Sequence, residues 1–181
     1  DKKGVEFVYG LTKTIMKTPL PFSTQSMLDK TKEWNLSDIA VPSSRGMTAR
    51  KAGDLMEIAL GQNDLEMMRQ IIIGCSRSGI NGLDIQINTM NRIKNNYRAE
   101  ETRLLKEYDD LMKKAKDPNT SPSMKTYLMD KANNKKVNAS KARNPQILYR
   151  QGIIKLYEEK RKFPEVFGEV TEADKKLIKS L

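Results

Sequence analysis

The sequence has no histidine and only one cysteine, and these two absences exclude several common kinds of functional site. Histidine is the most frequent general base, so a Ser-His-Asp or Cys-His catalytic arrangement within the chain is impossible. A zinc site built from cysteine and histidine is excluded for the same reason. We therefore expect a non-enzymatic protein without a metal, a cofactor or a small-molecule substrate. With no internal disulfide possible, we expect a reducing intracellular compartment, the cytoplasm or the nucleus, and not secretion.

Long apolar runs and the usual phosphate-binding loop are missing as well. No apolar stretch approaches the roughly 20 residues that a membrane-spanning helix needs. The segment 74–79 has the glycine spacing that begins a P-loop, but Ile80 and Asn81 stand where the motif requires Lys and Ser or Thr. The adjacent carboxylates Asp109 and Asp110 diverge by about 100° on a helix, which indicates a solvated surface instead of a paired acid site.

Apolar residues recur at intervals of three and four, which is the period of an α-helix. We predict an all-α bundle of six to eight helices with one long central helix over about 83–116. The chain is expected to form a single domain, with a near-neutral part (1–91), a basic part (92–162) and a short terminal helix (171–181). Cap, proline and glycine signals place the other helices over 4–17, after Ser23, over 49–60, from Asn63 to about 75, from Ser121, and from Asn144 to about 162.

The apolar seam of the long helix alternates steps of four and three, as in a coiled coil. Its members are Leu83, Ile87, Met90, Lys94, Tyr97, Glu101, Leu104, Tyr108, Leu111 and Ala115. Because two charged residues interrupt the seam, a bundle helix is favoured, and pairing with a second chain is the alternative. We expect Ile71, Ile72, Leu104 and Leu111 to be buried. In the helix that follows Ser121, we expect an inward face of Met124, Tyr127, Leu128, Ala132 and Val137.

Positive charge is the most specific signal in the sequence. The formal net charge is +10, from 33 basic and 23 acidic residues. The segment 92–162 alone holds nineteen Lys and Arg against nine Asp and Glu, and no acid falls within 131–157. An excess of this kind raises the local concentration of anionic partners.

The predicted nucleic-acid-binding residues are the cations of this acid-free interval and one tyrosine that could stack on a base: Lys131, Lys135, Lys136, Lys141, Arg143, Tyr149, Arg150 and Lys155. The leading hypothesis is a structural or architectural protein that binds RNA or DNA through phosphate contacts without sequence readout, as a viral nucleocapsid or matrix-like protein would. The alternatives are a helical protein-interaction module, including a homo-oligomer, and peripheral binding to an anionic membrane.

Overall fold

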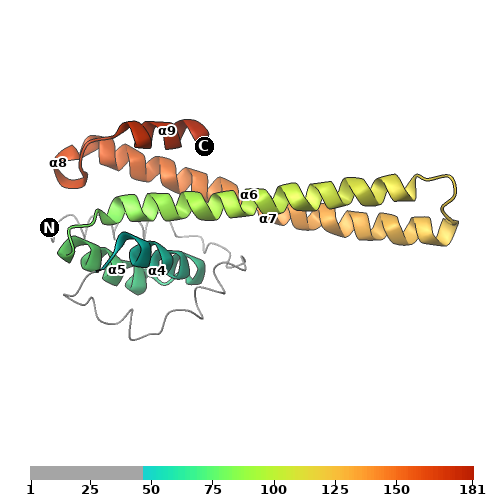
Figure 1. Cartoon of the computed structure of the whole chain (residues 1–181), viewed down its shortest axis with the longest axis horizontal. Coiled ribbons are helices and arrows are strands. Elements are labelled where there is room, and N and C mark those ends of the chain that lie inside the picture. Colours follow the sequence, from blue (N-terminus) through green and yellow to red (C-terminus); the bar gives the residue numbers. More distant parts are fainter. Residues whose placement is uncertain (1–46) are drawn as a thin grey trace. The chain divides into compact units, whose positions relative to one another are not determined.

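The computed structural model describes residues 47–181, and within this range the chain forms six α-helices and no strand (Figure 1). The helices are α4 (Ala49–Gln62), α5 (Leu65–Arg77), α6 (Gly82–Ala115), α7 (Pro122–Lys162), α8 (Pro164–Phe167) and α9 (Glu172–Ser180). The predicted all-α fold and the long helix over about 83–116 are confirmed. The helices expected over 4–17 and after Ser23 lie outside the described residues.

The chain divides into two compact units. The first, the bundle unit, comprises residues 47–93 of the described chain together with Leu148–Leu181. It holds α4, α5, α8 and α9, the beginning of α6 and the end of α7. The second, the hairpin unit, is Lys94–Ile147 and holds the rest of α6 and α7 with the loop that joins them. The two long helices therefore each contribute to both units.

Short polar side chains set the ends of α4 and α5. The hydroxyl of Thr48 accepts a hydrogen bond from the amide of Lys51 at 3.1 Å, which confirms the predicted N-cap. α4 continues past Gly61, the expected stop, and ends at Asn63 in the left-handed region (φ 53°). Asparagine is among the few non-glycine residues that adopt this conformation readily. Asp64 therefore caps α5 in place of Asn63, and its carboxylate accepts from the amide of Met67 at 3.0 Å.

The core of the bundle unit is aliphatic and rich in methionine. Its fully buried side chains include Leu55, Met56, Leu60, Met68, Ile71, Leu83, Ile87, Met90 and Ile153. Ile71 and Ile72 are buried as predicted. Cys75 is fully buried too, and this burial raises the pKa of its thiol to about 11, so the residue is an unreactive part of the core.

An ion pair between a buried glutamate and an exposed arginine joins α4 to α6 within the same unit. Glu57 has no solvent exposure, and its carboxylate accepts from the Arg92 guanidinium at 3.0 Å. The same guanidinium donates to the carbonyl oxygen of Gly53 at 3.3 Å. A buried carboxylate requires a cationic or hydrogen-bonding partner, so this pair fixes how α4 sits against α6.

α7 is one helix of 41 residues, and the predicted break at Asn144–Pro145 is wrong. Proline lacks the amide hydrogen that would complete the helix at this point, which ordinarily costs about 3 kcal/mol. Pro145 is itself buried, however, and the side-chain amide of Gln146 donates to the carbonyl oxygen of Ala142 at 3.1 Å. The missing amide would have bonded to the carbonyl oxygen of Lys141, and α7 nevertheless continues through this point. In the described range, no helix combines the length and the apolar character needed to cross a membrane.

Candidate nucleic-acid interface

The hairpin unit is made of two antiparallel helical arms that lie side by side (Figure 1). We call residues 94–115 the α6 arm and residues 122–147 the α7 arm. The connecting loop is held by short polar contacts: the hydroxyl of Thr120 donates to the carbonyl oxygen of Lys114 at 2.8 Å, and the hydroxyl of Ser121 accepts from the amide of Met124 at 3.3 Å. The Ser121 cap confirms the start of α7 that the sequence predicts.

Large side chains of the α6 arm and alanines of the α7 arm form the seam of this hairpin. Tyr97, Leu104 and Ala115 are buried on the α6 arm, as predicted, whereas Leu111 is only partly buried. The buried alanines of the α7 arm are Ala132, Ala139 and Ala142. Large side chains opposite small ones fill the space between two helices efficiently. The seam of the α6 arm is thus covered by the same chain.

The inward face predicted for the α7 arm is wrong at three positions. Met124, Tyr127 and Val137 are exposed by 49%, 58% and 54%. The buried line instead follows steps of four and three through Leu128, Ala132, Lys135, Ala139 and Ala142, of which Leu128 and Lys135 are partly buried. A prediction based on side-chain size selects the large apolar residues, whereas the register of the hairpin selects the alanines.

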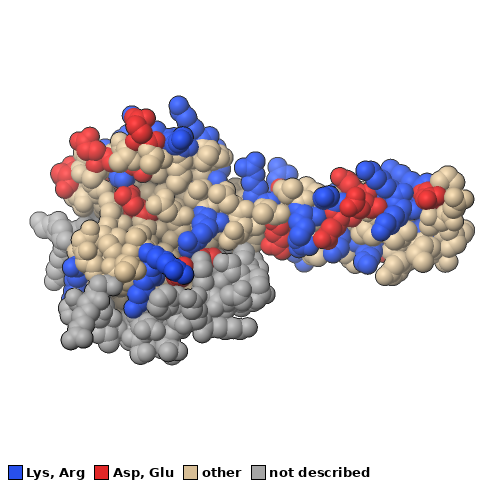
Figure 2. Space-filling model, viewed as in Figure 1, with Lys and Arg blue, Asp and Glu red and all other residues tan. Residues whose placement is uncertain are grey.

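Charge is distributed unequally between the two arms. The α7 arm has six Lys and Arg and a single acid, Asp130, whereas the α6 arm has six Lys and Arg and five Asp and Glu. Figure 2 shows basic side chains along the hairpin, with acidic side chains gathered among some of them. The excess positive charge of the hairpin therefore belongs mainly to the α7 arm.

The eight predicted site residues are divided between the two units. Lys131, Lys135, Lys136, Lys141 and Arg143 belong to the hairpin unit, whereas Tyr149, Arg150 and Lys155 belong to the bundle unit. Tyr149 has no solvent exposure, so the prediction that its ring stacks on a base is wrong. Arg150 and Lys155 are exposed. A single binding surface within one unit therefore contains only the five hairpin residues.

Lys135 differs from the other hairpin cations because it has an acidic partner on the opposite arm. Its ammonium lies 2.8 Å from a carboxylate oxygen of Glu107, which also pairs with Arg103 at 2.7 Å. Hydrogen bonds from Lys135 and Arg103 lower the pKa of the Glu107 carboxyl. Lys135 thus ties the two arms together and is less available to a ligand.

The other four predicted site residues of the hairpin unit are exposed and, among the described residues, form no ion pair. We call Lys131, Lys136, Lys141 and Arg143 the basic quartet. Two of its members lie over aromatic rings: the Lys131 ammonium is 5.9 Å from the centroid of Tyr127, and the Lys136 ammonium is 5.5 Å from that of Tyr108. Such contacts orient a cation without neutralising it. The quartet therefore presents four positive charges to solvent.

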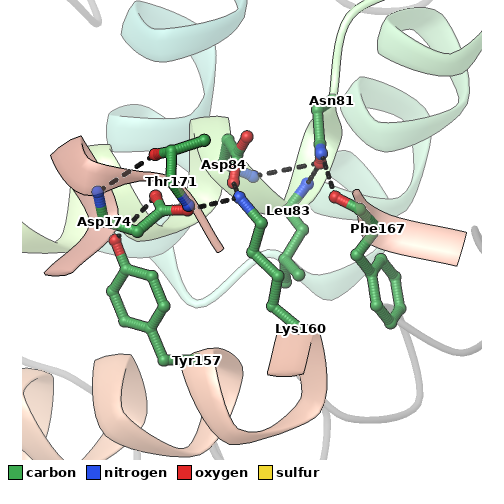
Figure 3. Close-up of polar contacts among 8 residues, drawn as sticks. All are labelled: Asn81, Leu83, Asp84, Tyr157, Lys160, Phe167, Thr171 and Asp174. Atoms are coloured by element: carbon green, nitrogen blue, oxygen red, sulfur yellow. Dashed lines mark hydrogen bonds and ion pairs between the residues drawn. The ribbon is translucent and has the colours of Figure 1, made fainter. Parts of the chain in front are cut away.

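A second polar cluster, in the bundle unit, surrounds a buried lysine (Figure 3). The Lys160 ammonium is 2% exposed and lies 2.8 Å from a carboxylate oxygen of Asp84 and 2.8 Å from one of Asp174. The hydroxyl of Tyr157 donates to the other oxygen of Asp174 at 3.1 Å. Asp174 also completes the predicted capping box of α9 with Thr171. We call Lys160, Asp84, Asp174 and Tyr157 the lysine clasp.

Lysine and carboxylates in one cluster are also found in catalytic sites, but the charges here favour a structural role. Burial alone would lower the pKa of Lys160, but hydrogen bonds to Asp174 and Asp84 outweigh burial and raise it overall. Burial, followed by the Asp174 charge, raises the pKa of Tyr157. Both side chains therefore keep their protons at neutral pH, and the protonated form of each is neither a base nor a nucleophile. The clasp joins α9 to α6 and α7.

Sequence comparison adds no further assignment to these two clusters. No protein-family model, curated protein or solved structure matches the chain. Across residues 47–181, no three side chains among His, Cys, Asp and Glu are grouped so that they could hold a metal ion. The function is therefore inferred from the surface of the chain itself.

Proposed function

We propose that this chain is a non-enzymatic structural protein that binds nucleic acid through the basic quartet of the α7 arm, by phosphate contacts without sequence readout. The observation that carries the proposal is the exposure of four cations without ion pairs, among the described residues, on an arm with one acid. A nucleocapsid-like or matrix-like role fits this chemistry. The proposal implies an intracellular location, in the cytoplasm or the nucleus, where nucleic acid is found.

The quartet is divided between two sides of the α7 arm, because at about 100° per residue Lys131 and Lys141 point to one side and Lys136 and Arg143 to the opposite side. Residues 131 and 143 are twelve positions apart on one helix, which corresponds to about 18 Å along its axis. Exposed amides are interleaved with the cations: Asn133, Asn134, Asn138 and Asn144. Amide side chains donate to phosphate and sugar oxygens, and contacts of this kind position a protein on a strand without selecting a sequence.

Binding of the full-length chain to nucleic acid should depend steeply on salt. If the quartet neutralises four phosphates, the logarithm of the association constant should fall against the logarithm of salt with a slope of about −3.6 on duplex and about −2.8 on single strands. Fluorescence anisotropy with labelled mixed-sequence oligonucleotides measures both slopes. Oligonucleotides of unrelated sequence should bind equally well. An absence of binding, or a slope near zero, would contradict the proposal.

A protein-interaction module is the second candidate, because large apolar side chains of the hairpin are exposed. They are Leu105, Met124, Tyr127, Met129, Val137 and Ile147. This function predicts a mass that rises with concentration in light scattering, with no salt-dependent affinity for nucleic acid. Binding to anionic vesicles but not to neutral ones, with nucleic acid a weak competitor, would instead indicate a membrane surface as the partner.

A further inference from the structure

One outward stripe of the α7 arm combines an aromatic ring, cations and amides. It consists of Tyr127, Lys131, Asn134, Asn138 and Lys141, and every one of these side chains is exposed. Successive members are four and three residues apart, so they lie on one side of the helix, over about 21 Å of its axis. The only acid of the arm, Asp130, lies beside this stripe and not within it. We call these five residues the outer stripe.

Tyr127 is the member of the outer stripe that phosphate binding alone does not explain. Its side chain is 58% exposed, which makes it the most exposed of the large apolar side chains in the described range. The Lys131 ammonium lies 5.9 Å from its ring centroid. A base stacked on this ring would have a cation within reach of its own phosphate. Single-strand binding surfaces combine positive charge with an aromatic ring on which a base stacks, and amides add contacts to phosphate and sugar oxygens.

We infer that the preferred ligand of the α7 arm is single-stranded nucleic acid, with one unpaired base stacked on Tyr127. This inference rests on the proposed function and adds the strandedness of the ligand to it. In a duplex the base faces are covered by their neighbours, so a duplex can use the cations of the arm but not the ring. Stacking on an aromatic side chain tolerates any base, which agrees with binding that does not read sequence.

The test compares Tyr127→Ala with the parent, using the full chain and two probes. One probe is a short mixed-sequence single-stranded RNA, and the other is the same strand annealed to its complement. Removal of the ring should weaken single-strand binding by roughly 5- to 150-fold and leave duplex binding within about twofold of the parent. Tyr127→Phe should bind like the parent, because it keeps the aromatic face.

Met129→Ala is the matched control, because it removes another exposed apolar side chain of the same arm, 38% exposed, that has no aromatic face. This variant should bind both probes like the parent, and circular dichroism should show the same helix content for all variants. Equal loss on the two probes, or no loss in Tyr127→Ala, would overturn the stacking inference while the proposed function stands. Failure of the parent to bind either probe would overturn both.

Discussion

Neutralising the basic quartet should abolish most of the affinity of this chain for nucleic acid. The variant carries Lys131→Gln, Lys136→Gln, Lys141→Gln and Arg143→Gln. Losing four phosphate contacts removes about 3.6 from the salt slope on duplex, which corresponds to a loss of affinity of about 4,000-fold at about 0.1 M salt. Glutamine is a good helix former and all four positions are exposed, so the hairpin should stay folded. Anisotropy measured over a range of salt concentrations gives both the affinity and the slope.

The same hairpin offers a control with an identical change in net charge. Lys106, Lys113, Lys114 and Lys116 are exposed, but they lie close in sequence to the acids of the α6 arm and of the loop after it. Changing these four lysines to glutamine should reduce affinity by no more than about tenfold, because screened, diffuse charge contributes less than direct phosphate contact. Equal losses in the two variants would show that net charge, and not the quartet, determines binding.

Removing the cation of the lysine clasp should have the largest effect on stability. In Lys160→Met, the carboxylates of Asp84 and Asp174 lose the ammonium that lies 2.8 Å from each of them. Breaking a buried ion pair by removing one partner costs about 3–5 kcal/mol, and we expect about 3 kcal/mol because Asp84 is partly solvated. Urea unfolding followed by circular dichroism measures the change. Adding Asp84→Asn and Asp174→Asn should recover much of the loss, since no unpaired charge then remains.

A neighbouring lysine of α7 provides the control for the clasp. Lys162 pairs with Glu159 at 3.7 Å, and its side chain is 59% exposed. Lys162→Met makes the same chemical change at a solvated position, so it should cost less than about 0.5 kcal/mol. A comparable loss of stability in both variants would show that the clasp contributes no more than a surface ion pair.

The clasp also predicts how stability depends on pH. The pKa of Asp174 is lowered in the folded chain, because the contacts from Lys160 and Thr171 outweigh the effect of burial. Asp174 therefore makes its full contribution to the stability of the folded chain above its unfolded pKa of about 3.9. This contribution is lost as the pH falls through the lower pKa that Asp174 has in the folded chain. The raised pKa of Lys160 adds a contribution that is present below about pH 10.4 and is lost at higher pH.

Lys160→Met should reverse the acid part of this dependence. Without the ammonium, the two carboxylates repel each other and the pKa of at least one rises. Protonation then relieves the repulsion, so the variant should gain stability as the pH falls from 7 towards 4. In the parent, Asp174 stays ionised and paired over the same pH range, so it causes no change in stability there. Parallel pH profiles for the parent and the variant would contradict the role assigned to Lys160.

Local signals in the sequence were sufficient to predict the helix ends that depend on a single side chain. Thr48, Ser121 and Thr171 each accept a backbone amide as predicted, because an N-cap is decided within one turn of the chain. The seam of α6 was also predictable, since its steps of four and three are populated by large apolar residues. Where local chemistry determines a feature, one sequence is enough to predict it.

The sequence-based predictions that were wrong concern features that depend on contacts between helices. The sequence signal at Pro145 predicts a helix start, but α7 continues through it and Pro145 is buried. Tyr149 lies in the acid-free basic interval and was predicted to be available for stacking, yet it is fully buried. Tyr127 was predicted to lie in the core. It is exposed instead, because alanines of the α7 arm occupy the seam with the α6 arm. The register of α7 relative to α6 decides these outcomes, and the apolar pattern of α7 alone did not reveal it.

Chemical footprinting of lysines in the complex tests the central proposal most directly. The full-length chain is acetylated with and without a saturating single-stranded oligonucleotide, and modification of each lysine is quantified by mass spectrometry. Binding through the α7 arm predicts strong protection of Lys131, Lys136 and Lys141, with Lys106, Lys113 and Lys114 of the α6 arm modified as in the free protein. Equal protection of the two arms, or protection confined to lysines outside the α7 arm, would contradict it.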